Sequence, residues 1–236
     1  MNRLELKDVS THYGTSHILF DVSLAVDEGE VVCLLGRNGA GKTTTIKTIM
    51  GLARASSGGI EFAGENLIGL QPHEIARLGV GYAPDERLIF PDLTVRENLE
   101  IATKKGVDPG FEEWTVERIY EMFPALAPLD GNLGGSMSGG EQQMLTVGRT
   151  LMGNPSLLLL DEPVEGVAPI VVQELGRQIR KLRDMGLTIL FSEQNLQFAT
   201  KISDRAYIIE KGRIQFQGTI EELEKNNEIQ EKYLMI

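Results

Sequence analysis

The sequence predicts an α/β fold in which an antiparallel β element and an inserted helical region are attached to a core of parallel strands. The first observation is a glycine-rich loop, residues 36–43, that lies between an apolar strand-like run and a helix-like segment. The second is a continuous run of leucines, residues 157–160, which is typical of a strand buried on both faces. The third is the absence of strand patterns between about residues 87 and 150, where helix patterns predominate.

The amino-terminal residues predict the antiparallel element. Residues 4–9 and 20–26 alternate polar and apolar side chains, as half-buried strands do. Residues 30–35 are apolar and rich in β-formers, so they predict the buried strand that leads into the glycine-rich loop. The other elements expected here are a turn at 11–14, a helix that follows the loop at 44–50, strands at 59–64 and 80–83, and a helix at 72–78.

The remaining residues predict a helical insertion and then the return of the core. Thr94 and Glu97 form a capping-box pattern, which predicts a helix that runs to about residue 103. Trp114 is expected on an amphipathic helix, in the core of the insertion. The other expected elements are a loop at 106–110, helices at 112–122 and 169–185, strands at 187–191, 205–210 and 213–217, and a helical tail at 221–236.

The glycine-rich loop fits the phosphate-binding pattern G-x-x-x-x-G-K-[ST], and its flanks supply the strand and helix that this pattern requires. Such a loop aims backbone N–H groups and the positive end of a helix dipole at one point. Lys42 is expected to reach the β- and γ-phosphates, and the Thr43 hydroxyl to ligate Mg²⁺. The residues expected to bind nucleotide are Gly36, Asn38, Gly39, Ala40, Gly41, Lys42, Thr43 and Thr44. The sequence therefore predicts a protein that binds a nucleoside triphosphate.

Two carboxylates follow the leucine run. Asp161 stands at the carboxyl end of the predicted strand, where a protein with a phosphate-binding loop ligates Mg²⁺. Glu162 is placed to polarise an attacking water as general base. The alternative is a solvated pair of acids at a strand end.

A second candidate anion site begins at Ser138. Ser138 and Glu141 form another capping-box pattern, and Gly139 and Gly140 allow the backbone at this helix start to approach a ligand closely. One nucleotide rarely needs two such loops from a single subunit. Taken alone, the segment is equally compatible with a helix that is merely capped.

Together the three motifs resemble those of the ATP-binding subunits of ABC transporters, over essentially the whole chain. The resemblance implies one domain, residues 1–236, with a P-loop NTPase (RecA-like) core. Residues 1–86 and 151–236 would form this core with its antiparallel β subdomain, and residues 87–150 would form the inserted α-helical subdomain that carries the signature segment.

The resemblance also explains the second anion site, because in this family two subunits face each other head to tail. Ser138, Gly139 and Gly140 of one subunit would close over the γ-phosphate held by the other, with ATP and Mg²⁺ as cofactors. The partner cassette would be identical or paralogous. Tyr13 matches the aromatic residue that stacks on adenine, although an ordinary turn aromatic is the alternative.

Within the family the sequence is most similar to the ATPases of branched-chain amino acid and urea or short-amide uptake systems, and this split leaves the solute open. Asp85 stands where most members carry the glutamine that senses the γ-phosphate, and it could still hold Mg²⁺ or water. Gln194 replaces the usual switch histidine, so it would position water or phosphate without titrating near neutrality. Ala168 replaces a common aspartate.

The formal net charge of −11 excludes an electrostatic footprint for nucleic acid. No apolar run approaches the roughly 20 residues of a membrane span. The resemblance implies a peripheral subunit at the cytoplasmic face of the plasma membrane, held by permease subunits and linked through them to an external solute-binding protein. We hypothesise that the apolar segment 88–91 lines the groove that receives a cytoplasmic helix of that permease.

Two rival classes remain. A non-transport ABC ATPase would usually carry a second cassette or a long coiled-coil insertion, and the sequence shows neither. A GTPase switch or a small-molecule kinase would explain the phosphate-binding loop but not the signature segment beside Asp161 and Glu162.

Overall fold

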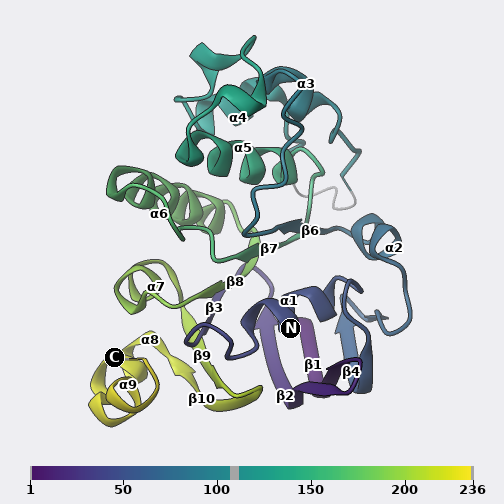
Figure 1. Cartoon of the computed structure of the whole chain (residues 1–236), viewed down its shortest axis with the longest axis vertical. Helices are drawn as coiled ribbons and strands as arrows, with labels where there is room; N and C mark the ends of the chain where they lie inside the picture. Colours follow the sequence, from purple (N-terminus) through teal and green to yellow (C-terminus); the bar gives the residue numbers. More distant parts are fainter. Residues whose placement is uncertain (1, 107–111, 235–236) are drawn as a thin grey trace.

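Figure 1 shows the computed structural model, in which residues 2–106 and 112–234 are described. An antiparallel sheet and a mostly parallel sheet lie next to each other, and helices surround the second sheet. The predicted α/β class is confirmed, with an antiparallel sheet beside a mostly parallel one.

The antiparallel sheet has the strand order β2-β1-β4-β5. Its strands are β1 (Asn2–Tyr13), β2 (Ser16–Asp27), β4 (Ala55–Phe62) and β5 (Glu65–Asn66). The turn predicted at 11–14 is wrong, because β1 continues through Tyr13 and pairs Tyr13 with Ser16. Only Gly14, at φ +57°, and Thr15 connect the two strands, and the rings of the paired residues His12 and His17 stack at 3.9 Å.

The second sheet has the order β10-β9-β3-β8-β7-β6. Its strands are β3 (Val31–Leu35), β6 (Val80–Ala83), β7 (Leu157–Asp161), β8 (Thr188–Glu193), β9 (Arg205–Glu210) and β10 (Arg213–Thr219). Strands β6, β7, β8, β3 and β9 are parallel, and β10 runs antiparallel to β9. Every residue of β3, β7 and β8 is buried, which accounts for their continuous apolar sequences.

The two faces of this sheet belong to two separate hydrophobic clusters. Leu157 and Leu159 point to the face that packs against Ile46 of α1 (Lys42–Ile49) and against the antiparallel sheet. Leu158 and Leu160 point to the opposite face, with Leu145 of α5 (Gly139–Leu151). Side chains alternate across a strand, so β7 separates α1 from α5.

The remaining helices of the core complete these layers. They are α2 (Pro72–Arg77), α6 (Pro169–Asp184), α7 (Leu196–Ile202), α8 (Ile220–Lys225) and α9 (Asn227–Tyr233). The tail that was predicted as one helix is two, because Asn226 ends α8 and its side chain caps α9 at the N–H of Ile229. Residues 235–236 of that prediction lie outside the described residues.

The helical region, residues 87–150, forms the upper part of Figure 1. Besides α5 it contains α3 (Val95–Glu100), α4 (Val116–Met122) and the short 3₁₀ turns η1 (Ala127–Leu129) and η2 (Gly134–Ser136). Its buried side chains belong to the same cluster as one face of the parallel sheet, so it packs onto the core.

Two helix boundaries in this region differ from the prediction. Helix α3 ends at Glu100 because the chain turns back, and the N–H of Lys104 bonds the carbonyl of Met152. Helix α4 begins only at Val116, where the Thr115 hydroxyl caps it. Trp114 is buried as expected but lies before that helix. Most of the loop predicted at 106–110 lies outside the described residues.

Candidate functional site: a nucleotide-binding loop facing two carboxylates

The glycine-rich loop connects β3 to α1. Its glycines meet two local demands: Gly39 and Gly41 have φ values of +78° and +115°, and a Cβ on Gly36 would lie 2.5 Å from the carbonyl oxygen of Ile209. Gly41 is the N-cap of α1, and no side chain caps this helix. The first-turn N–H groups of α1 therefore remain for an anionic ligand.

Lys42 points back along this loop. Its Nζ donates hydrogen bonds to the carbonyls of Gly36, at 2.8 Å, and Arg37, at 3.1 Å. It also forms an ion pair with Oε1 of Glu162 at 3.0 Å, and both side chains are buried. The ammonium is thus held over the loop, in contact with the carboxylate predicted to act as base.

Asp161 ends β7 and receives hydrogen bonds from both neighbouring elements. The Thr43 hydroxyl donates to its Oδ1 at 3.1 Å, and the Ser192 hydroxyl of β8 donates to the same oxygen at 2.6 Å. Burial raises the pKa of Asp161, while the two hydrogen bonds oppose that rise. The two predicted Mg²⁺ ligands, Thr43 and Asp161, therefore lie in direct contact.

Glu162 adopts a backbone conformation that is unusual for its residue type, with φ at +43°. Its N–H donates to Ser192 Oγ at 3.0 Å, and its buried Oε2 has no hydrogen-bond partner among the residues that the structure describes. Strained backbone and unpaired buried oxygens concentrate at functional sites, where the surrounding structure holds them in place. Both features are consistent with a carboxylate that awaits a ligand or a water.

Asp85 lies just beyond β6, in a half-buried position. Burial raises its pKa to about 6, and a hydrogen bond with Glu86 and the charge of Asp161 act in the same direction. Its Oδ1 is buried without a partner. Asp85 is thus close enough to Asp161 to sense its charge, as expected for a residue of the same site.

The side-chain oxygens of Thr43 and Asp161 suit a hard cation that also takes oxygen ligands from phosphate. Thr43 and Asp161 offer a hydroxyl and a carboxylate, which is the donor chemistry that Mg²⁺ prefers. Within residues 2–106 and 112–234, no group of three or more His, Cys, Asp and Glu side chains could hold a metal by itself. The hydroxyl and the carboxylate thus fit a cation that shares further oxygen ligands with the phosphates of a nucleotide.

Gln194 follows β8 and is exposed. Its backbone N–H donates to Oε2 of the buried Glu193 at 3.0 Å, and the N–H of Asn195 donates to the same oxygen. The backbone carbonyl of Glu193 accepts the N–H of Gly36 at 3.1 Å. The end of β8 is thereby attached to the start of the phosphate-binding loop, and Gln194 lies beside it.

The signature segment and Tyr13 are not brought into that group. Ser138 caps α5, where it forms the predicted capping box with Glu141. Helices α5 and α1 pack on opposite faces of β7. Tyr13 is 48% exposed and ends β1 at the hairpin.

Comparison with known proteins places this arrangement in a family. Residues 19–165 match the family described as ABC transporter. The chain belongs to the ABC transporter ATP-binding family. The high-affinity branched-chain amino acid transport ATP-binding protein BraG of Pseudomonas aeruginosa is 43% identical, over 98% of this chain and 99% of its own length. This result confirms the resemblance of the motifs and the identification of an ATPase.

Other relatives of this ABC ATPase differ in what their names say they transport. The probable branched-chain amino acid transport ATP-binding protein LivF of Archaeoglobus fulgidus is 39% identical, over 89% of both chains. The lipopolysaccharide export system ATP-binding protein LptB of Haemophilus influenzae is 37% identical, over 99% of this chain and 98% of its own.

Solved structures agree with the fold. A nucleotide-free ATP-binding cassette from an ABC transporter superposes with a TM-score of 0.82 at 29% identity, over 96% of this chain and 94% of the other. An ATP-binding cassette of an ABC transporter in its ADP conformation gives 0.80 at 30% identity, with the same coverage. No helix in the described part of the ABC ATPase is long and apolar enough to cross a membrane.

Sequence reasoning missed three residues of this site in the ABC ATPase. Ser192 bonds both carboxylate-bearing residues, Glu193 holds the Gln194 backbone, and Arg87 bonds the loop that follows Glu162. Ser192 and Glu193 precede Gln194 directly, so the end of an apolar strand was the available signal. Arg87 had none, because its partners come from distant segments.

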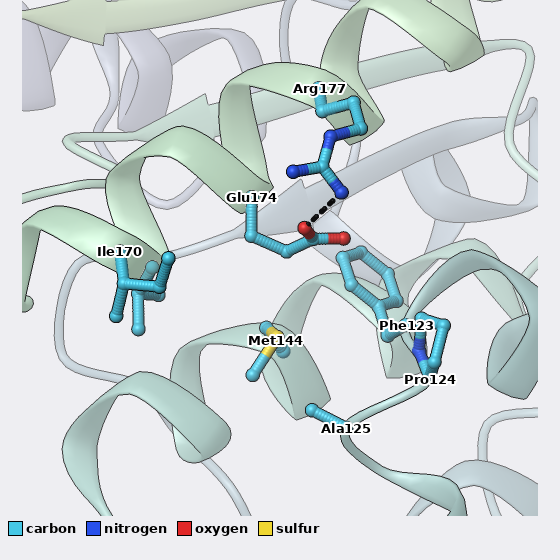
Figure 2. A pocket seen from close by; sticks show the side chains of 8 residues that line it. Phe123, Pro124, Ala125, Met144, Ile170, Glu174 and Arg177 are labelled. Carbon is cyan, nitrogen blue, oxygen red and sulfur yellow. Dashed lines mark ion pairs between the residues drawn. The ribbon is translucent and has the colours of Figure 1, made fainter.

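A hollow of about 440 Å³ lies outside the nucleotide site, between the helical region and α6 (Figure 2). The side chains around it are mostly apolar, and an ion pair of 2.6 Å joins Glu174 to Arg177 at its edge. The lining residues are Phe123, Pro124, Ala125, Met144, Ile170, Val171, Glu174 and Arg177. The hollow thus lies where α6 faces the helical region.

Proposed function

We propose that this ABC ATPase powers the uptake of branched-chain amino acids through a separate membrane permease. The observation that carries the ATPase function is the convergence of Lys42, Thr43, Asp161 and Glu162 at the end of the parallel sheet. Support for the solute comes from BraG and LivF, which match nearly the full chain. The alternatives are the same role for urea, short-chain amides or another small carboxylate, and less favourably a non-transport ABC ATPase.

The proposed chemistry is phosphoryl transfer to water, in which the protein mainly positions groups and neutralises charge. Lys42 and the uncapped N–H groups of α1 would hold the phosphates. Glu162 would release Lys42 to the phosphates, then orient and deprotonate water with its freed carboxylate. Gln194 and Asp85 would respond to the γ-phosphate. A bound Mg²⁺, held by Thr43 and Asp161, would neutralise the developing negative charge on the phosphates.

We further propose that two cassettes act head to tail. Ser138, Gly139 and Gly140 start a helix on the face of β7 opposite to α1, which supports a role toward another subunit's nucleotide. The partner would be identical or paralogous. The pair would lie at the cytoplasmic face of the plasma membrane, held by permease subunits and served indirectly by an external solute-binding protein.

Replacement of Glu162 by glutamine tests the ATPase and the dimer together. The amide keeps the size of the carboxylate but is not a base, so Glu162→Gln should bind ATP, lose turnover and accumulate as an ATP-bound dimer. Steady-state ATP hydrolysis and analytical ultracentrifugation with and without ATP measure the two effects. Hydrolysis at the parental rate would assign the base to another residue.

The solute needs a separate experiment. The cassette should be assembled with its permease in vesicles, and candidate solute-binding proteins loaded with leucine, with urea or with no solute should be added. The proposal expects the leucine-loaded protein to stimulate ATP hydrolysis and leucine to accumulate. Stimulation by the urea-loaded protein alone would favour the alternative.

A further inference from the structure

The loop that follows Asp85 is held against the signature helix by one arginine. Arg87 Nε donates to Oε1 of Gln143, in the second turn of α5, at 3.1 Å. Its Nη2 donates to the backbone carbonyl of Glu165, in the loop after Glu162, at 2.7 Å. One guanidinium therefore joins three segments: the loop after β6, helix α5 and the loop after β7.

The surroundings of Arg87 are shaped to its side chain. A Cβ on Gly139 would lie 2.6 Å from Nη1, and one on Gly166 would lie 3.5 Å from Nη2. The signature glycine Gly139 thus leaves space for this guanidinium. Arg87 itself has φ at +50°, a conformation that is uncommon for a residue with a side chain and requires support from its contacts.

The signature helix also meets α6 beside this junction. A Cβ on Gly140 would lie 2.6 Å from Cγ2 of Val171, so the two helices approach closely there. The hollow of Figure 2 lies between α6 and the helical region. Both acceptors of Arg87 are uncharged, so its bonds fix direction rather than neutralise charge.

We infer that Arg87 is a positioning residue that transmits the state of the Asp85 loop and of the Glu162 loop to the signature helix. This inference rests on the proposed function, since it concerns how the signature segment is presented to the partner's nucleotide. When Arg87 bonds both acceptors, Ser138 and Gly139 are held in register with the carboxylate that acts on the chain's own nucleotide. Loss of Arg87 leaves nucleotide binding to the phosphate-binding loop intact but impairs closure of the dimer.

The test compares Arg87→Ala with the parental protein, both as the full chain with Mg²⁺ and ATP. We expect ATP affinity of the monomer to stay close to parental, and kcat to fall about tenfold. In the Glu162→Gln background, the ATP-dependent dimer should weaken by about the same factor. Arg118→Ala is the matched control, because Arg118 also bonds backbone carbonyls, but those of Glu112 and Glu113 rather than groups of α5 or of the loop after β7. This variant should leave kcat and dimerisation unchanged.

A second variant separates positioning from folding. Gln143→Leu removes the acceptor on α5 but keeps a buried side chain of similar size, and it should lower kcat as Arg87→Ala does. In the double variant the two losses should not multiply, since both changes remove the same Arg87–Gln143 hydrogen bond. If Arg87→Ala lowers the melting temperature, the kcat of Gln143→Leu decides whether the loss of activity comes from positioning or from unfolding.

Three results would overturn the inference: parental kcat and dimerisation in Arg87→Ala, a loss of ATP affinity in the monomer that accounts for the whole effect, or parental kcat in Gln143→Leu. The proposed function fails by other measurements, namely absence of hydrolysis by the parental protein or of ATP-bound dimers in Glu162→Gln. The two failures are therefore distinguishable.

Discussion

Ser192 connects the two carboxylates of the site. Its hydroxyl donates to Asp161 and accepts the N–H of Glu162, and it is completely buried. The register of β7 and β8 puts Ser192 directly beside Asp161. A single hydroxyl therefore fixes the aspartate that is proposed to hold Mg²⁺ and the strained backbone of the proposed base.

Ser192→Ala should lower both the unfolding free energy of the protein and its kcat for ATP hydrolysis. The change leaves a buried N–H and a buried carboxylate each with one bond fewer, which costs about 1–3 kcal/mol of unfolding free energy. Ser203→Ala is the control: Ser203 is also buried, and its hydroxyl bonds the carbonyl of Ala199, which keeps the N–H of Ser203. Urea denaturation and kcat measure both variants, and equal losses in the two would contradict a special role for Ser192.

Site residues could be predicted where their role depends on neighbours in the sequence. Lys42 and Thr43 lie within one contiguous motif, and Asp161 and Glu162 follow one apolar run, so spacing alone indicated them. The contacts of Ser192 depend on which strand lies beside β7. That neighbour is set by long-range pairing, which a local pattern does not contain.

At the scale of elements, strand existence was easier to predict than strand length. Strand β1 runs to Tyr13 and β2 starts at Ser16, several residues beyond the alternating patterns. The register shifts around Asp8 and Asp21, which have φ values of +49° and +53°, interrupt the alternation. A bulge places two residues of one strand opposite one residue of its partner. The alternation of polar and apolar residues therefore stops at the bulge, although the strand continues beyond it.

The segment after β6 offers a surface element that can be tested. Leu88 and Phe90 are 59% and 47% exposed, while Ile89 between them packs against the core. The guanidinium of Arg149 lies 5.0 Å from the Phe90 ring and donates to the carbonyl of Leu88. Helix α5 thus holds the segment with its apolar side chains outward, as the proposed permease groove requires.

Phe90→Asp should leave ATP binding by the isolated cassette intact and uncouple transport, because a charge replaces an apolar contact with the permease. ATP binding by the free cassette and solute uptake by the assembled transporter measure the two. Met185→Asp is the control, since Met185 is 41% exposed but lies at the end of α6. Uptake at the parental rate in Phe90→Asp would contradict the groove.

For the whole molecule, the sequence indicated the layers but not the strand order. Apolar runs identified β3, β7 and β8 as buried strands. In the sheet, however, β8 lies between β3 and β7, although it is the last of these three strands in the sequence. This order joins the end of β8 to the phosphate-binding loop through Glu193 and Gly36. It also buries the Glu193 carboxylate.

Glu193 should make the unfolding free energy depend on pH. Burial raises its pKa from 4.5 to about 7, and hydrogen bonds from Gln194 and Asn195 only partly oppose this. The folded state therefore holds the proton more tightly than the unfolded chain, so the stabilisation is complete below about pH 4.5 and is lost as pH rises through about 7.

Glu193→Gln removes this titration while its amide oxygen can still accept both backbone N–H groups. Between about pH 5 and pH 8 the variant should therefore gain about 2–3 kcal/mol of unfolding free energy relative to the parental protein. Glu97→Gln is the control, because hydrogen bonds from Thr94 lower the pKa of Glu97 below its usual value of 4.5. Glu97 is therefore ionised in the folded and the unfolded chain throughout this range, and its difference from the parental protein should stay flat between about pH 5 and pH 8. Urea denaturation at several pH values measures each difference. Parallel pH profiles for the parental protein and Glu193→Gln would show that the buried carboxylate is not what titrates.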